Sequence, residues 1–125
     1  MKIIINTPNA PTPIGPYSQA VLVGNTLYLS GQVCIDPSNG TLVNATIEAE
    51  ARQVMKNLLA VLTEAGMDFS NVVKTTIFLK NMNDFGAVNN VYGEFFTANF
   101  PARETVEVSK LPKEAHVEIS CIAMK

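Results

Sequence analysis

One long amphipathic segment, set between shorter β-type runs, limits the fold more than any other feature of this sequence. From about Thr46, apolar residues recur at steps of three or four, which is the period of one helix face. Acidic residues stand near its start, and Gly66 stands where helices commonly end. The pattern therefore predicts a helix over residues 46–66. The recurring residues are Ile47, Ala51, Val54, Leu58, Val61 and Ala65.

The remaining segments read mostly as strands. Val72 to Leu79 (VVKTTIFL) is rich in β-branched residues and predicts a buried strand. A second helix is expected from Asn83 or Asp84 through Phe95 and Phe96, stopped by Pro101. The other predicted strands are 3–5, 20–23, 26–29, 104–108 and 116–123, with Gly24-Asn25 as a hairpin turn. This order predicts a single α+β domain over residues 1–125, with two helices on one face of a mixed sheet of about six strands.

Composition narrows the possible partners. The chain is 47% apolar and only 16% charged, against about 25% charged in typical domains, which suggests that other copies of the chain cover part of its surface. Its net charge of −2 and its scattered lysines and arginines disfavour nucleic acid. Two cysteines, Cys34 and Cys121, are expected as small buried residues in strands, and with one histidine they give no metal spacing.

The chain carries no evident targeting signal. Its start, MKIII, has an apolar run far shorter than a signal-peptide core, and no stretch approaches the ~18 apolar residues of a membrane span. We therefore expect a cytoplasmic protein.

Arg103 is the strongest candidate site residue. It follows Phe100-Pro101-Ala102 and opens a β-type run, an apolar setting in which a permanent charge needs a partner. If residues 109–112 form a hairpin turn, antiparallel pairing sets Arg103 opposite Glu118 and Thr105 opposite His116. Arg103 then either forms a structural salt bridge with Glu118 or binds a ligand carboxylate, with Glu118 free to hold a water.

Other candidates are weaker when taken alone. Four prolines between Pro8 and Pro16 predict an ordered, extended loop, in which Tyr17 either plugs the core or projects into a neighbour's cleft. Ser30-Gly31 would allow a ligand close to the backbone, or would form a bulge. Asn89, in the second helix, faces solvent in the simplest interpretation. His116 is expected to be exposed near a turn.

Several short runs together carry a family resemblance. They are IGPYSQA (14–20), SGQ (30–32), VVKTTIFL (72–79), NDF (83–85) with VNNVY (88–92), and PAR, VEV, LPK and VEI within 101–119. In this order they span nearly the whole chain, and the last group is the most specific. The chain resembles the Rid family of reactive intermediate deaminases, also called endoribonuclease L-PSP.

The resemblance implies a homotrimer of chorismate-mutase-like (bacillus-type) subunits with a cleft at each interface. It also implies hydrolysis of 2-imino acids, such as 2-iminopropanoate and 2-iminobutanoate, to 2-keto acids and ammonia, without cofactor or metal. Arg103 matches the carboxylate-binding arginine, and Glu118 matches the glutamate that positions the attacking water. Further residues match cleft positions: Tyr17 (from the adjacent subunit), Ser30, Gly31 and Asn89.

Two positions depart from the family pattern. Thr105, expected to contact substrate, stands where many members carry cysteine. Glu104 follows the arginine, where a small residue is usual. Strand alternation should turn Glu104 away from the cleft, whereas a bulge would bring it beside Arg103, where it would compete with a substrate carboxylate.

The sequence is compatible with two other functions. The family's older name suggests an RNA-cleaving or translation-inhibiting protein, but one histidine and a net charge of −2 argue against it. A non-catalytic module that binds a small carboxylate or a client protein is the second alternative. The presence of Arg103 favours catalysis over such a role.

Overall fold

A computed structural model describes all 125 residues as one six-stranded sheet and two helices. The strand order is β1-β2-β3-β6-β4-β5, and only β4 and β5 are parallel neighbours. The strands are β1 (Lys2–Ile5), β2 (Ala20–Val23), β3 (Thr26–Gln32), β4 (Val72–Leu79), β5 (Ala102–Glu107) and β6 (Val117–Met124); the helices are α1 (Ile47–Glu64) and α2 (Phe85–Gly93). The expected α+β architecture is confirmed.

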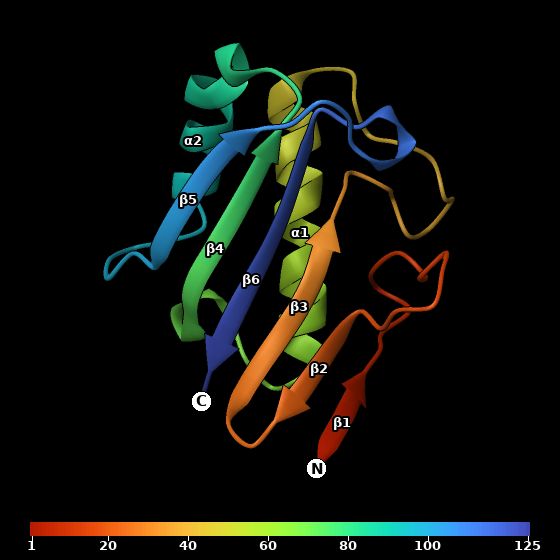
Figure 1. Ribbon diagram of the computed structural model, residues 1–125, viewed down its shortest axis with the longest axis vertical. Coiled ribbons are helices and arrows are strands. Elements are labelled where there is room, and N and C mark those ends of the chain that lie inside the picture. Colours follow the sequence, from red (N-terminus) through yellow and green to blue (C-terminus); the bar gives the residue numbers. More distant parts are fainter.

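The predicted long helix is α1, and local signals set both of its ends. The Thr46 hydroxyl accepts a hydrogen bond from the Ala49 N–H at 3.0 Å, which caps the first turn. At the other end Gly66 has φ +74°, and the Met67 N–H bonds to the Leu62 carbonyl at 2.9 Å. This is a Schellman ending, which a residue without Cβ forms most readily. In Figure 1, α1 crosses behind the central strands, and it contacts β3, β6 and α2.

The second helix is shorter than predicted. It ends at Gly93, and the aromatic residues beyond it pack outside any helix. The rings of Phe95 and Phe96 lie 5.5 and 5.3 Å from the ring of Phe69, in edge-on contacts. Asp84 makes no capping bond; Asn81 instead accepts a bond from the Asn83 N–H and caps the 3₁₀ turn Met82–Asp84 that precedes α2.

The predicted pairing of the two closing strands is wrong. β4 lies between β5 and β6, pairing in parallel with β5 and antiparallel with β6. Arg103 is therefore opposite Thr75, and Glu118 is opposite Phe78. The connection, residues 108–116, is longer than a tight hairpin loop and includes the 3₁₀ turn Pro112–Glu114, so it can pass over the end of β4.

The two sheet faces differ in what covers them. One face packs on the helices, with Leu27, Ile77 and Ile119 at 0–1% exposure. The other face has no helix, and large apolar side chains on it stay exposed. Strand register places four of them there: Ile4 (44% exposed), Tyr28 (50%), Val106 (41%) and Met124 (45%). So much apolar surface on one face is typical of an interaction surface.

The hairpin turn is confirmed, with Gly24 at φ +59°. Both cysteines are buried and free, but only Cys121 lies in a strand; Cys34 follows the end of β3. Neither helix is long and apolar enough to cross a lipid bilayer.

Candidate active site

Arg103, on β5, holds its charge without a counter-ion in the chain. Its Nη1 donates to Oδ1 of Asn89 at 2.8 Å, and no carboxylate forms an ion pair with it. Its guanidinium carbon lies 5.0 Å from the ring centre of Tyr92 and 5.6 Å from that of Phe85, both on α2. These aromatic faces and one amide orient the guanidinium but leave its charge available to an incoming anion.

A cavity of about 460 Å³ opens beside this guanidinium. Its lining is Asn89, Tyr92, Gly93, Phe100, Pro101 and Arg103. Tyr92 is fixed by a hydrogen bond of 2.8 Å between its hydroxyl and Thr75 Oγ1. Burial raises the pKa of Tyr92, although the Thr75 bond and the Arg103 charge oppose this. The phenol therefore stays neutral beside the arginine and does not neutralise it.

Glu104 does not compete for this arginine. Its Oε1 pairs with Nζ of Lys74 at 2.8 Å on the face of the sheet that the helices leave open. The predicted alternation is confirmed, since Glu104 and Arg103 project to opposite faces. Thr105, two residues after Arg103, shares the helix-covered face, and its hydroxyl is buried without a hydrogen-bond partner in the chain.

A second cavity, of about 370 Å³, contains the remaining predicted residues. Tyr17, Ser30, Gly31 and Glu118 all line it. The carboxylate of Glu118 accepts no hydrogen bond from the chain, and burial raises its pKa. A carboxyl group of this kind can exchange a proton nearer to neutral pH than an exposed glutamate can.

The β3 edge of this cavity is a bulge. The pairing of β3 with β6 shifts between Leu29 and Gln32, so Ser30 and Gly31 have no ladder partner on β6. A Cβ on Gly31 would lie 3.0 Å from Cγ of Glu118 and closer still to its carboxylate. The absence of a side chain at position 31 thus makes room for Glu118.

The proline-rich loop is ordered by one buried side chain. Gln19, 2% exposed, accepts a bond from the Thr7 N–H at 2.7 Å and donates to the carbonyls of Thr7, Ala10 and Pro11. Ser30 joins the same loop to β3, because its hydroxyl donates to the Ser18 carbonyl at 2.6 Å. Tyr17 does not plug the core; it is 51% exposed.

The predicted site residues therefore form two separate groups within one chain. Arg103, Asn89 and Thr105 lie on the helix-covered side of β5. Glu118 projects from the opposite face of β6, because its pairing partner Phe78 and the Arg103 partner Thr75 have opposite orientations on β4. The salt bridge between Arg103 and Glu118 is not formed. A site that uses both groups needs residues from two chains.

Comparison with known proteins places the chain in a family. The family model described as Endoribonuclease L-PSP matches residues 7–125. The chain belongs to the Endoribonuclease L-PSP family. This confirms the resemblance to the Rid proteins, since a protein described as a member of the Rid family matches along the whole chain.

Members of the Endoribonuclease L-PSP family with known activity or structure are close in sequence. The human 2-iminobutanoate/2-iminopropanoate deaminase is 50% identical over 125 residues, covering 100% of this chain and 91% of the human one. A conserved Rid family protein of Yersinia pestis has a structure with TM-score 0.97 and 52% identity, covering 100% of both chains. E. coli TdcF, solved with bound serine, has TM-score 0.95 and 37% identity, covering 98% of both.

Sequence reasoning missed three buried polar residues in this member of the Endoribonuclease L-PSP family: Gln19, Glu50 and Asn57. Each is 1–2% exposed and bonds to backbone near the second cavity. Two of them could have been noticed in the sequence, because Glu50 and Asn57 are polar residues that fall on the apolar stripe of α1. His116 is half-exposed, as expected, but its Nδ1 lies 2.8 Å from Oε1 of Glu50. No three acidic, histidine or cysteine side chains come together to hold a metal ion.

Proposed function

We propose that this protein hydrolyses small 2-imino acids, such as 2-iminopropanoate and 2-iminobutanoate, to 2-keto acids and ammonia. The observation that carries the proposal is the Arg103 guanidinium, oriented by Asn89, Tyr92 and Phe85 and left without a counter-ion beside a cavity. The human relative bears this activity in its name at 50% identity. A guanidinium in this state suits a substrate carboxylate, which it can hold by two parallel hydrogen bonds.

The proposed site is shared between subunits of a homotrimer. One subunit supplies Arg103, Asn89 and Thr105, and its neighbour supplies Tyr17, Ser30, Gly31 and Glu118. Two observations support this division: the groups project from opposite faces of the sheet, and the open face carries exposed apolar side chains that a neighbour would cover.

The proposed reaction requires an oriented substrate and one attacking water. Arg103 holds the substrate carboxylate, assisted by the Gly31 N–H at the bulge. Glu118 orients a water and accepts its proton as the oxygen bonds to the imine carbon. With a protonated imine, this step gives a neutral carbinolamine. Glu118 then returns its proton to the nitrogen, and the carbon–nitrogen bond breaks as the hydroxyl group gives its own proton to the Glu118 carboxylate and becomes the carbonyl of the keto acid. The released ammonia takes that last proton from Glu118 and leaves as ammonium. Glu118 ends in its starting state, and the balance needs no further reactant.

Location and partners form part of the proposal. Two free, buried cysteines suit a reducing compartment, and we propose the cytoplasm. A nucleic-acid partner is not part of it, because the net charge is −2 and the positive side chains are scattered.

The proposal is tested with an imine generated in situ by an amino-acid oxidase, following keto-acid release with and without the protein. We expect acceleration by the wild type and a loss of about tenfold or more in Arg103→Ala, because a bond to a charged group contributes about 1.5–3 kcal/mol. Arg103→Lys should recover activity only in part, since a lysine lacks the two-point geometry. An Arg103→Ala variant as fast as the wild type would remove the basis of the proposal.

Shared sites can be tested by mixing inactive subunits. Arg103→Ala and Glu118→Gln chains, unfolded together and reassembled, should regain about a quarter of the wild-type rate if each site takes one residue from each of two subunits. Each variant reassembled alone should remain inactive. Absence of any recovery in verified mixed trimers would contradict a site that combines Arg103 of one subunit with Glu118 of another.

A further inference from the structure

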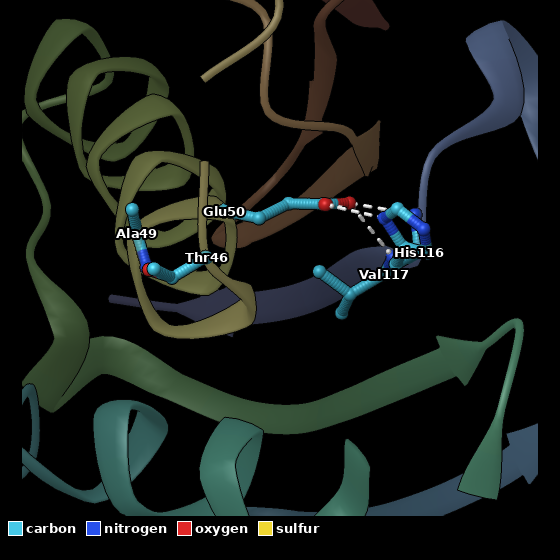
Figure 2. Close-up of polar contacts among 5 residues, drawn as sticks. All are labelled: Thr46, Ala49, Glu50, His116 and Val117. Atoms are coloured by element: carbon cyan, nitrogen blue, oxygen red, sulfur yellow. Dashed lines mark hydrogen bonds and ion pairs between the residues drawn. The ribbon is translucent and has the colours of Figure 1, made fainter. Parts of the chain in front are cut away.

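Glu50 is an almost fully buried carboxylate outside the proposed site. It lies in the first turns of α1, is 1% exposed, and reaches the start of β6 (Figure 2). Its Oε2 accepts from the backbone N–H groups of His116 at 2.6 Å and Val117 at 3.1 Å, and its Oε1 lies 2.8 Å from Nδ1 of His116. A carboxylate buried this fully is costly unless it is fully bonded, as this one is.

The two backbone groups that Glu50 binds immediately precede Glu118. On the other side, the His116 carbonyl accepts a bond from the Lys80 N–H at 2.9 Å, just beyond β4. The peptide leading into Glu118 is therefore held from α1 and from β4. The Glu118 carboxylate itself accepts no bond from the chain, so the backbone and the contact with Gly31 are what fix its place.

A similar contact from α1 holds another part of the lining of the same cavity. Asn57 lies two helical turns after Glu50, on the same side of α1, and is 1% exposed. Its Nδ2 donates to the carbonyls of Val33 at 3.0 Å and Ile35 at 2.9 Å, both of which line the cavity that contains Glu118. Helix α1 thus holds both the peptide that leads into Glu118 and the segment that contains Val33 and Ile35.

We propose that Glu50 is a positioning residue, which sets the backbone at His116 and Val117 so that Glu118 presents its carboxylate to the attacking water. This inference rests on the proposed imine hydrolysis. Glu50 acts through geometry and not through its charge. Displacement of a reacting group by about 1 Å can cost about a hundredfold in rate, which makes such a distant contact kinetically visible.

Two substitutions separate geometry from charge. Glu50→Gln keeps the length of the side chain, and its amide oxygen can accept both backbone hydrogen bonds. Its NH₂ group can donate to Nδ1 of His116 when the ring proton is on Nε2. Glu50→Asp keeps the charge but is one methylene too short to reach. We expect kcat within about threefold of wild type for Glu50→Gln, and a fall of about tenfold or more for Glu50→Asp.

Binding of pyruvate distinguishes a positioning role from general damage. In the proposed site the pyruvate carboxylate is held mainly by Arg103, on a strand that Glu50 does not contact, so the Kd for pyruvate should stay within about twofold in both variants. A Glu50→Asp protein that is folded, binds pyruvate normally and turns over at the wild-type rate would overturn the proposal. So would a Glu50→Gln protein that binds pyruvate normally but loses kcat about tenfold, because charge would then be what matters.

Hydrogen exchange in the wild type tests whether Glu50 holds the backbone at His116 and Val117. This measurement depends neither on activity nor on how well Glu50→Asp folds. The His116 and Val117 amides should exchange slowly in the wild type and in Glu50→Gln, with fast exchange at these two amides in Glu50→Asp. Fast exchange at both amides in the wild type would overturn the proposal. If the wild type released no keto acid yet protected these amides, imine hydrolysis would fail while the contact with Glu50 stood.

Discussion

A Cβ atom on Gly31 would lie 2.8 Å from Cδ of Glu118, a distance that real Cβ atoms essentially never show. The glutamate side chain occupies the space that any larger residue at position 31 would need. The carboxylate end of Glu118 is flexible, so an added methyl group would push it aside instead of unfolding the strand. The position of the carboxylate is therefore coupled to the absence of a side chain across the cavity.

Gly31→Ala should impair turnover more than stability. We expect the rate of keto-acid release to fall about tenfold or more, because the carboxylate is displaced, while overpacking typically lowers the free energy of unfolding by about 1–3 kcal/mol. Gly86→Ala is the matched control, since a Cβ there meets nothing within 4 Å and alanine favours the helix. Urea unfolding and the coupled assay on both variants check this; a fully active Gly31→Ala would contradict it.

Asn89→Asp should weaken ligand binding by supplying Arg103 with a counter-ion. The amide oxygen already lies 2.8 Å from Nη1, so a carboxylate in its place would form an ion pair and compete with the substrate. We expect the Kd for pyruvate to rise about tenfold or more, and further than in Asn89→Ala, which only removes an orienting contact. Isothermal titration with pyruvate measures both; equal effects in the two variants would argue against competition.

Glu104→Gln should leave binding and turnover close to wild type. Its partner Lys74 lies on the other face of the sheet from Arg103, and both side chains are well exposed. An exposed pair of this kind contributes about 0–1 kcal/mol to the free energy of unfolding. Tighter pyruvate binding in Glu104→Gln would mean that this glutamate reaches Arg103 after all.

Glu118 should give activity and stability opposite dependences on pH. Burial holds its folded-state pKa above the ordinary value of a glutamate, so its favourable contribution to folding is fully present below that ordinary value and is lost as pH rises through the folded-state pKa. Turnover needs the ionised carboxylate, so its rate should instead increase as pH rises through the folded-state pKa. Glu118→Gln should therefore be inactive yet at least as stable as wild type at pH 7. Urea unfolding across pH tests this, and a clearly less stable Glu118→Gln at pH 7 would contradict it.

Thr105→Val should raise stability and weaken ligand binding. The Thr105 hydroxyl is buried with no partner in the chain, and removing such a group should stabilise the fold by about 1 kcal/mol. If the hydroxyl meets the ligand, the Kd for pyruvate should rise about three- to tenfold, the contribution of one neutral hydrogen bond. Thermal unfolding and titration check both halves. A less stable Thr105→Val protein would show that the hydroxyl is already bonded within the assembly.

Sequence patterns predicted well those elements whose signals lie within a few residues. The ends of α1 follow from the Thr46 cap and from Gly66, and β4 follows from its run of β-branched residues. Alternation along β5 correctly placed Arg103 and Glu104 on opposite faces. The extent of α2 was overestimated, because Phe95 and Phe96 continue its apolar pattern while packing on Phe69 outside the helix.

Pairing between strands was the step that the sequence did not determine. A residue pattern states which face of a strand is buried, but not which strand becomes its neighbour, and β4 separates β5 from β6. The same holds for Gln19, Glu50 and Asn57, whose backbone partners lie far from them along the chain or in irregular segments.

The sequence by itself determined the family, the α+β fold and the identity of the candidate residues, because local periodicity and short motifs carry that information. Only the tertiary structure decided that Arg103 and Glu118 project from opposite faces, with Arg103 lacking a counter-ion and Glu118 lacking a hydrogen-bond donor in its own chain. The physical reason is that register and neighbour choice depend on how the whole sheet packs against α1 and α2, and no single segment encodes that packing.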